Sequence, residues 1–266
     1  MIESMKKIFL MLALVATVSA ASAWEKRPDE GVFLLAKKHL SPDTKALVEN
    51  YLGTTYNDDV FYLRDLEAKK KATHSKELRY LHLSADLKPI GVEGEDALKG
   101  IEQALVVVRD HKSHDKSVVV KALRTIINLM CEMHNMGYVR IEGFPQSQAD
   151  FSFACYGGDY GKRKTTAPYK WSKFWDFYTH WHGGFSGDLW AEDMELCLGE
   201  KRAELSKGSL NDWATQIGEK AAELYSRVNP EYVMTRRERN ELEELNYEMM
   251  TRAGYRLAVL LNENLK

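Results

Sequence analysis

The sequence predicts an all-α protein built as a single-domain multi-helix bundle. Apolar residues recur at helical spacing through most of the chain, and helix-capping residues precede several of these stretches. Strands and helices do not alternate in the way that marks a parallel sheet. Residues 24–266 are long enough for one large domain with a hydrophobic core, and we expect them to form one helical domain.

The first 23 residues have the pattern of a secretory signal peptide. Lys6 and Lys7 give a positively charged start, residues 8–18 form a short apolar run, and Ala-Ser-Ala at residues 21–23 fits a cleavage site. A membrane anchor is the weaker interpretation, because the run is short for a membrane span and no second one follows. We expect an exported, periplasmic or extracellular protein that starts at Trp24 and is not inserted in a membrane.

Several helices are expected before the middle of the chain. Residues 30–39 form an amphipathic helix. Ser41 then caps a second one, with Pro42 in its first turn and Gly53 at its end. We expect a further helix over residues 60–71, a short apolar segment over 78–83, a loop over 91–94 and another helix over 96–109.

The central helix is expected over residues 122–140. Apolar residues cover most of its circumference, and a narrow polar stripe runs along one side: Lys121, Thr125, Asn128, Glu132 and Asn135. Such a stripe faces either water or an internal polar site, and periodicity alone favours water.

The second half of the chain ends in two helices, over residues 211–227 and 237–261. Residues 143–168 are irregular and could include a small hairpin. The aromatic residues of 169–178 either line a cleft or pack in the core.

The mixed charges of the last helix are typical of a solvated face with ion pairs. His111 and His114 lie in a polar stretch that we interpret as a solvated connection.

Net charge and cysteines limit the function classes. The formal net charge of -2 excludes the overall basic field of a tight nucleic-acid binder, although weak local binding remains open. Cys155 and Cys197 can form a disulfide in an exported protein, which the sequence leaves undecided. Cys131 lies in the central helix and is expected to be a small core residue.

Short motifs spread over residues 24–262 carry a family resemblance. They are Trp24 after the signal, Ser41-Pro42 through Gly53, Leu81-His82-Leu83, Gly157-Gly158-Asp159, Trp175-Asp176, Trp213-Ala214, and the segment 253–262. In this order the chain resembles the secreted zinc-dependent single-strand nucleases of the S-one/P-one type, relatives of the zinc phospholipases C. The resemblance implies a helical fold with three zinc ions in a cleft. There a metal pair generates hydroxide, and the mature terminal Trp is a ligand.

The family's zinc ligands carry over only in part. Trp24, Asp65, His82 and Asp176 match family ligands. Asp29, Asn128, Tyr138 and Ser172 stand where the family has histidines, Glu132 replaces the bridging aspartate, and Ala68 replaces an arginine thought to contact phosphate. His134 matches a family histidine that is not a ligand.

These changes predict an altered metal site. The position that combines Asp176 with Tyr138 and Ser172 should lose its metal. The remaining set is rich in oxygen: Trp24, Asp29, Asp65, His82, Asn128 and Glu132. It suits one calcium, magnesium or manganese ion better than a zinc cluster. A buried hydrogen-bond network without metal is an equal alternative.

Two hypotheses for function follow from the resemblance. The first is a largely inactivated member, a monomeric pseudoenzyme that keeps the cleft, holds one divalent ion or none, and binds a ligand there. The second is an active metal-dependent endonuclease or phosphodiesterase that hydrolyses single-stranded nucleic acid or 3'-phosphates. In this second case Asp65 and Glu132 would be the catalytic residues of a reshaped site. We favour the first, because the lost imidazoles and arginine remove stabilisation of the transition state.

Overall fold

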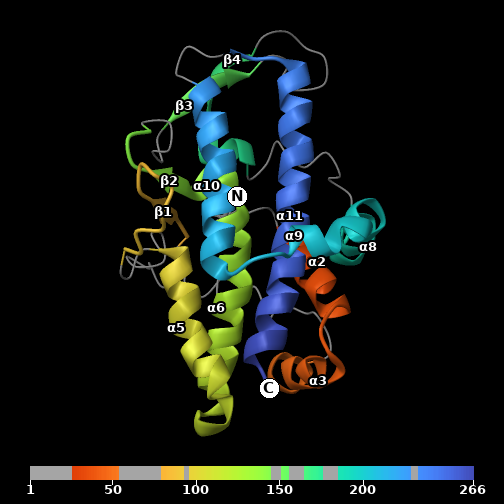
Figure 1. Cartoon of the computed structure of the whole chain (residues 1–266). Helices are drawn as coiled ribbons and strands as arrows, with labels where there is room; N and C mark the ends of the chain where they lie inside the picture. Colours follow the sequence, from red (N-terminus) through yellow and green to blue (C-terminus); the bar gives the residue numbers. More distant parts are fainter. Residues whose placement is uncertain are drawn as a thin grey trace, which may run out of the picture.

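Long helices packed side by side dominate the computed structural model (Figure 1). It describes residues 26–53, 79–92, 96–144, 151–155, 165–175, 185–228 and 233–266. The helices are α2 (Lys26–Lys38), α3 (Pro42–Leu52), α5 (Ala97–Arg109), α6 (Lys116–His134), α7 (Trp171–Lys173), α8 (Gly187–Leu198), α9 (Arg202–Leu205), α10 (Leu210–Arg227) and α11 (Arg236–Asn264). Short 3-10 turns are η1 (His111–Ser113), η2 (Met136–Tyr138) and η5 (Gly199–Lys201). The predicted all-α class is confirmed at this level.

Two small sheets accompany the helices. Strands β1 (Leu81–Leu83) and β2 (Val139–Ile141) pair in parallel, with His82 opposite Arg140. The second sheet has the order β4-β3-β5, formed by β3 (Ser152–Cys155), β4 (Thr165–Lys170) and β5 (Val233–Met234). Since β3 and β4 pair antiparallel, the hairpin allowed over residues 143–168 is present.

The cap predicted at Ser41 is present, and Asp96 caps a further helix. The Ser41 hydroxyl accepts a hydrogen bond from the backbone N–H of Thr44, with Pro42 in the first turn. Asp96 caps α5 through the N–H of Lys99. Gly53 ends α3 with a φ of 90°, a left-handed value that favours glycine. The first helix and the last two lie within a few residues of their predicted bounds.

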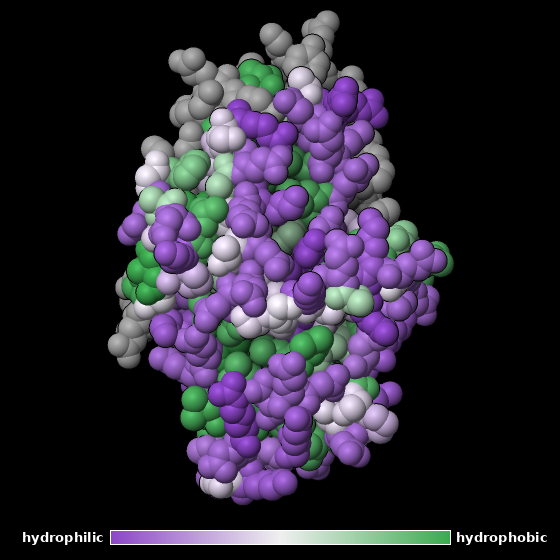
Figure 2. Space-filling view, viewed as in Figure 1, coloured by the Kyte–Doolittle hydropathy of each residue, from purple (hydrophilic) through white to green (hydrophobic). Residues whose placement is uncertain are grey.

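One continuous cluster of buried hydrophobic residues joins α2, α5, α6, α10 and α11. The aromatic side chains of Trp171, Phe174 and Trp175 belong to it, so core packing accounts for them. On the surface, the face in Figure 2 is mostly hydrophilic with small hydrophobic areas. Over the part of the chain that the structure describes, no helix combines the length and apolar character needed to cross a membrane.

One sequence interpretation needs correction here, and one question that the sequence left open is answered. His111 is not part of a solvated connection. It is buried, with Nδ1 2.9 Å from the Tyr51 hydroxyl and Nε2 3.0 Å from the carbonyl oxygen of Lys266, so it fastens the chain's last residue. Cys197 carries an exposed free thiol, so the disulfide left open with Cys155 is not formed. Cys131 is buried as predicted.

Candidate functional site

The polar stripe of α6 passes from the surface into the interior. Lys121 is exposed, whereas Asn128, Glu132 and Asn135 are buried, with relative exposures of 9%, 6% and 0%. The preference for a solvated face is therefore wrong for the second half of the stripe. The reason is tertiary, because the segment around β1 and the turn η2 cover this end of α6.

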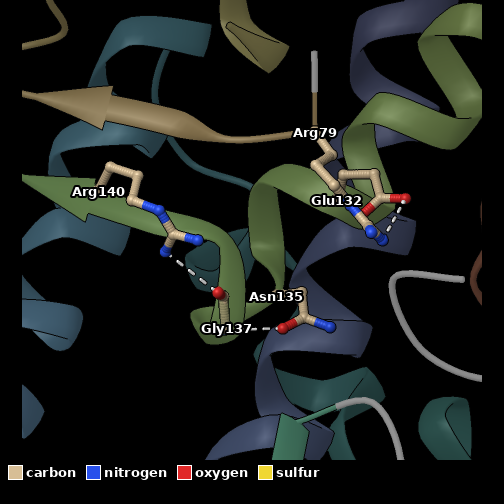
Figure 3. Close-up of polar contacts among 5 residues, drawn as sticks. All are labelled: Arg79, Glu132, Asn135, Gly137 and Arg140. Carbon is tan, nitrogen blue, oxygen red and sulfur yellow. Dashed lines mark hydrogen bonds and ion pairs between the residues drawn. The ribbon is translucent and has the colours of Figure 1, made fainter. Parts of the chain in front are cut away.

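The helix ends at His134 instead of continuing to residue 140. Asn135 leaves the helical conformation, and its side-chain oxygen accepts a hydrogen bond from the N–H of Gly137 at 2.8 Å (Figure 3). A Cβ on Gly137 would lie 2.9 Å from the Cα of Ser172, so the turn requires glycine there. The chain then enters β2, which a longer helix would have prevented.

Arg79 fills the space beside Glu132. Its Nη2 lies 3.2 Å from Oε2 and 3.4 Å from Oε1, and its Nε lies 3.3 Å from Oε2 (Figure 3). Both side chains are largely buried, with exposures of 14% and 8%. The other side of the guanidinium faces the ring of Tyr138, 3.8 Å from the ring centroid. Arg79 thus contacts two positions that the resemblance assigns to metal ligands.

A second arginine–tyrosine contact continues from the first. The guanidinium of Arg140 lies 4.1 Å from the ring centroid of Tyr80, and this ring meets Tyr138 edge to face at 5.9 Å. Nη1 of Arg140 donates to the carbonyl oxygens of Gly137 and Val139 at 3.3 and 3.2 Å (Figure 3). Cation–π contacts of this kind stabilise half-buried guanidinium groups. Two cations and two aromatic rings therefore pack together around the end of α6.

Among the described residues, His82 is held by Asp96. The backbone N–H of His82 donates to Oδ2 of Asp96 at 2.8 Å, and its Nδ1 lies 3.3 Å from the same oxygen. Asp96 is fully buried, whereas the imidazole is partly exposed. A carboxylate behind one ring nitrogen fixes the imidazole orientation and leaves Nε2 facing away.

The structure brings few of the predicted ligands together. Glu132 and Tyr138 both contact Arg79. His82 contacts Asp96 instead. Asp29 is buried in the first turn of α2. Asn128 is buried one turn before Glu132, and Ser172 lies beside Gly137. Trp24, Asp65, Ala68 and Asp176 lie outside the described residues, as do the signal segment and the expected helix over residues 60–71.

The described residues do not fit the zinc cluster that the resemblance implies. No group of three or more histidine, cysteine, aspartate or glutamate side chains among them could hold a metal ion. Both carboxylate oxygens of Glu132 face a guanidinium, and a divalent cation beside that permanent charge would be repelled. The resemblance places an aspartate at this position, and glutamate extends the carboxylate further by one methylene.

His134 has a structural role. Its Nδ1 lies 2.8 Å from the carbonyl oxygen of Met130, so Nδ1 carries the proton and Nε2 accepts from Nη1 of Arg256 at 3.1 Å. Burial, together with the charge of Arg256, lowers the pKa of His134 well below its ordinary value. Arg256 also donates to the Leu205 carbonyl oxygen and the Gln216 side chain. This network joins α6 to α9, α10 and α11 and leaves His134 unsuited to metal binding.

Sequence reasoning missed Arg79 and Arg140. Arg79 precedes β1 by two residues and lies 53 positions from Glu132, so no local pattern links them. Asp96 was expected only as the start of a helix, and neither its cap role nor its contact with His82 was predicted.

Comparison with known proteins adds no assignment: no protein-family model matches this chain, and no curated protein is significantly similar to it.

Proposed function

We propose that this chain is an exported, catalytically inactive relative of the S-one/P-one type zinc nucleases, a pseudoenzyme in which an arginine stands in for the metal. The observation that carries the proposal is the buried contact of Arg79 with Glu132, continued by the ring of Tyr138. The ordered motifs between Trp24 and Asn262 support the family assignment. In this proposal the protein is a monomer that binds a nucleotide or a single-stranded nucleic acid without cleaving it.

The chemical argument concerns the nucleophile. Hydrolysis in the family depends on metal ions that generate hydroxide and stabilise the leaving oxygen. A guanidinium neutralises Glu132 but, with its high pKa, cannot lower the pKa of a bound water as a divalent ion does. Displacing Arg79 from a buried pair would also leave a buried charge without its partner, at a cost of about 3–5 kcal/mol. In the proposed site the positive charge of Arg79 neutralises the Glu132 carboxylate, but no metal ion is held there to lower the pKa of a water molecule.

An active enzyme is the alternative that a specific contact favours. The carboxylate–imidazole contact of Asp96 with His82 is the arrangement that orients metal-binding histidines in other proteins. In this alternative one zinc, calcium, magnesium or manganese ion would be held by His82 with Trp24 and Asp65. The reaction would be hydrolysis of single-stranded nucleic acid or of 3'-phosphates.

A cleavage assay separates the two proposals. The full chain, purified without chelators, is incubated with labelled single-stranded DNA in the presence of zinc, calcium, magnesium or manganese. The pseudoenzyme proposal predicts no cleavage above background with any of them. Cleavage that is lost in His82→Ala, but kept in the exposed control His114→Ala, would overturn it.

A further inference from the structure

One face of the β1–β2 sheet brings an imidazole and a guanidinium together beside one tyrosine. His82 lies opposite Arg140 in the parallel pairing, so the two side chains leave the sheet on the same side. The guanidinium carbon of Arg140 lies 4.1 Å from the ring centroid of Tyr80, and the His82 ring meets that ring edge to face at 6.1 Å. The other side of the sheet is buried in the core and carries Leu81, Leu83, Val139 and Ile141.

Arg140 is a cation that forms no ion pair with the residues that the structure describes. Its Nη1 donates to the carbonyl oxygens of Gly137 and Val139 (Figure 3), whereas its Nη2 is shielded from water and, among the same residues, has no hydrogen-bond partner. A shielded donor without a partner is costly, and more so on a charged group. Arg79, by contrast, has the carboxylate of Glu132. Since Arg140 as a residue is only half-buried, an anion from outside the chain can approach the guanidinium.

His82 offers the opposite kind of group, a hydrogen-bond acceptor. A carboxylate only accepts, so the 3.3 Å contact with Oδ2 of Asp96 requires the proton of the neutral ring on Nδ1. The lone pair is then on Nε2, which makes no hydrogen bond within the described part of the chain. Asp96 also accepts from the backbone N–H of His82, so the carboxylate is fixed in place. With the His82 side chain 24% exposed, Nε2 can accept from a hydroxyl group of a ligand.

We propose that this face, formed by Tyr80, His82 and Arg140, is a metal-independent site for a ribonucleotide unit, either free or within single-stranded RNA. The guanidinium of Arg140 binds a phosphate oxygen, for which its planar set of donors is suited. Nε2 of His82 accepts from the ribose 2'-hydroxyl, the group that lets proteins distinguish RNA from DNA. This site rests on the proposed function, because it names the kind of nucleotide that the chain binds without cleaving it.

The test measures the binding of fluorescently labelled oligo(rA) and oligo(dA) of equal length to the full chain, in the presence of EDTA because the site needs no metal ion. The native chain should bind the RNA about threefold to tenfold more tightly than the DNA, through one additional hydrogen bond. Arg140→Met should weaken binding of both strands by about tenfold or more, because the charged contact with phosphate is lost. The slope of log affinity against log salt should also become shallower by about 0.7.

Two further variants make the test specific. His82→Phe keeps an aromatic ring beside Tyr80 but has no acceptor, so it should remove the preference for RNA and leave DNA affinity unchanged. Arg227→Met, which removes an arginine from an exposed ion pair on α10, is the control for loss of one positive charge and should change neither affinity. Competition by adenosine 3'-monophosphate separates the two sources of the ribonucleotide. Equal potency per nucleotide would assign the site to free ribonucleotides, and weaker competition would assign it to RNA.

The failures of this site and of the proposed function are distinguishable. If Arg140→Met binds both strands as the native chain does, or if His82→Phe keeps the preference for RNA, the site does not exist, although binding by the native chain still supports the proposed function. If the native chain binds neither strand, the site and the binding role in the proposed function both fail. The His82→Phe variant keeps the test decisive if circular dichroism shows that Arg140→Met does not fold.

Discussion

The guanidinium of Arg79 lies 3.2 Å from the carboxylate of Glu132, in a position where both side chains are shielded from water. The carboxylate belongs to the central helix, and the guanidinium comes from the segment before β1. In the proposed function Glu132 stands where the resembling nucleases have a bridging metal ligand, so this contact decides how the proposed site is interpreted. There a fixed organic cation would supply the positive charge, and it would offer no open coordination position to a substrate or a water molecule.

Breaking this ion pair from one side should be costly. Arg79→Met leaves the Glu132 carboxylate buried without its charge partner, and we expect the free energy of unfolding to fall by about 3–5 kcal/mol. Adding Glu132→Gln should recover most of the loss, because the stranded charge is then removed. Urea unfolding of the two single variants and the double variant measures the coupling. Arg237→Met, from an exposed pair, should change stability by less than about 0.5 kcal/mol. Equal losses in both arginine variants would show that the Arg79 pair is unimportant.

The turn after α6 should be intolerant of any side chain at Gly137. Alanine there places a Cβ against the backbone of Ser172, and we expect a loss of about 1–3 kcal/mol in thermal or urea unfolding. Gly199→Ala is the matched control. Its Cβ would lie 3.0 Å from Oε1 of Glu195, a side-chain atom rather than backbone, so a shift of a few tenths of an ångström relieves the contact. A Gly137→Ala variant as stable as the Gly199→Ala variant would contradict the proposed close approach.

His134 should make stability depend on pH in a known direction. Its pKa is lowered in the folded state, so below about pH 6.5 the unfolded chain binds a proton that the folded chain does not. Stability from the neutral imidazole is complete above that pH and falls as the pH decreases. Its contribution to the slope is about 1.4 kcal/mol per pH unit until the folded-state pKa is reached.

Urea unfolding at several pH values between 5 and 8 measures this slope. His134→Gln should be less stable at neutral pH and show a flatter dependence, whereas His114→Gln, at an exposed position, should keep the original slope. An unchanged slope in His134→Gln would place the responsible groups elsewhere.

Much of the helical framework could be predicted from local sequence. The cap at Ser41 and the helix expected over residues 96–109 rest on local patterns, and the structure has both where they were expected. The end of the central helix could not be predicted in this way. It depends on the approach of Gly137 to Ser172, which are 35 positions apart, and on pairing of β2 with β1.

The candidate site was predictable only in part. Helical spacing singled out Asn128 and Glu132, and the family resemblance singled out His82. All three are partly or wholly buried near the end of α6 or in β1. Their partners come from elsewhere in the chain, and side-chain reach decides which charge meets which. The cation beside Glu132 is Arg79, which lies outside α6. The periodicity of a single helix therefore cannot identify it.

Metal content tests the central claim most directly. The processed chain that starts at Trp24, and its Arg79→Met variant, are purified without chelators, passed through gel filtration, and measured by elemental analysis. We expect no bound zinc in the native chain, with at most one weakly held ion of the calcium type. Arg79→Met should hold more divalent ion than the native chain, because Glu132 is then free to act as a ligand. Two or more zinc ions per native chain would contradict the account and favour an active nuclease.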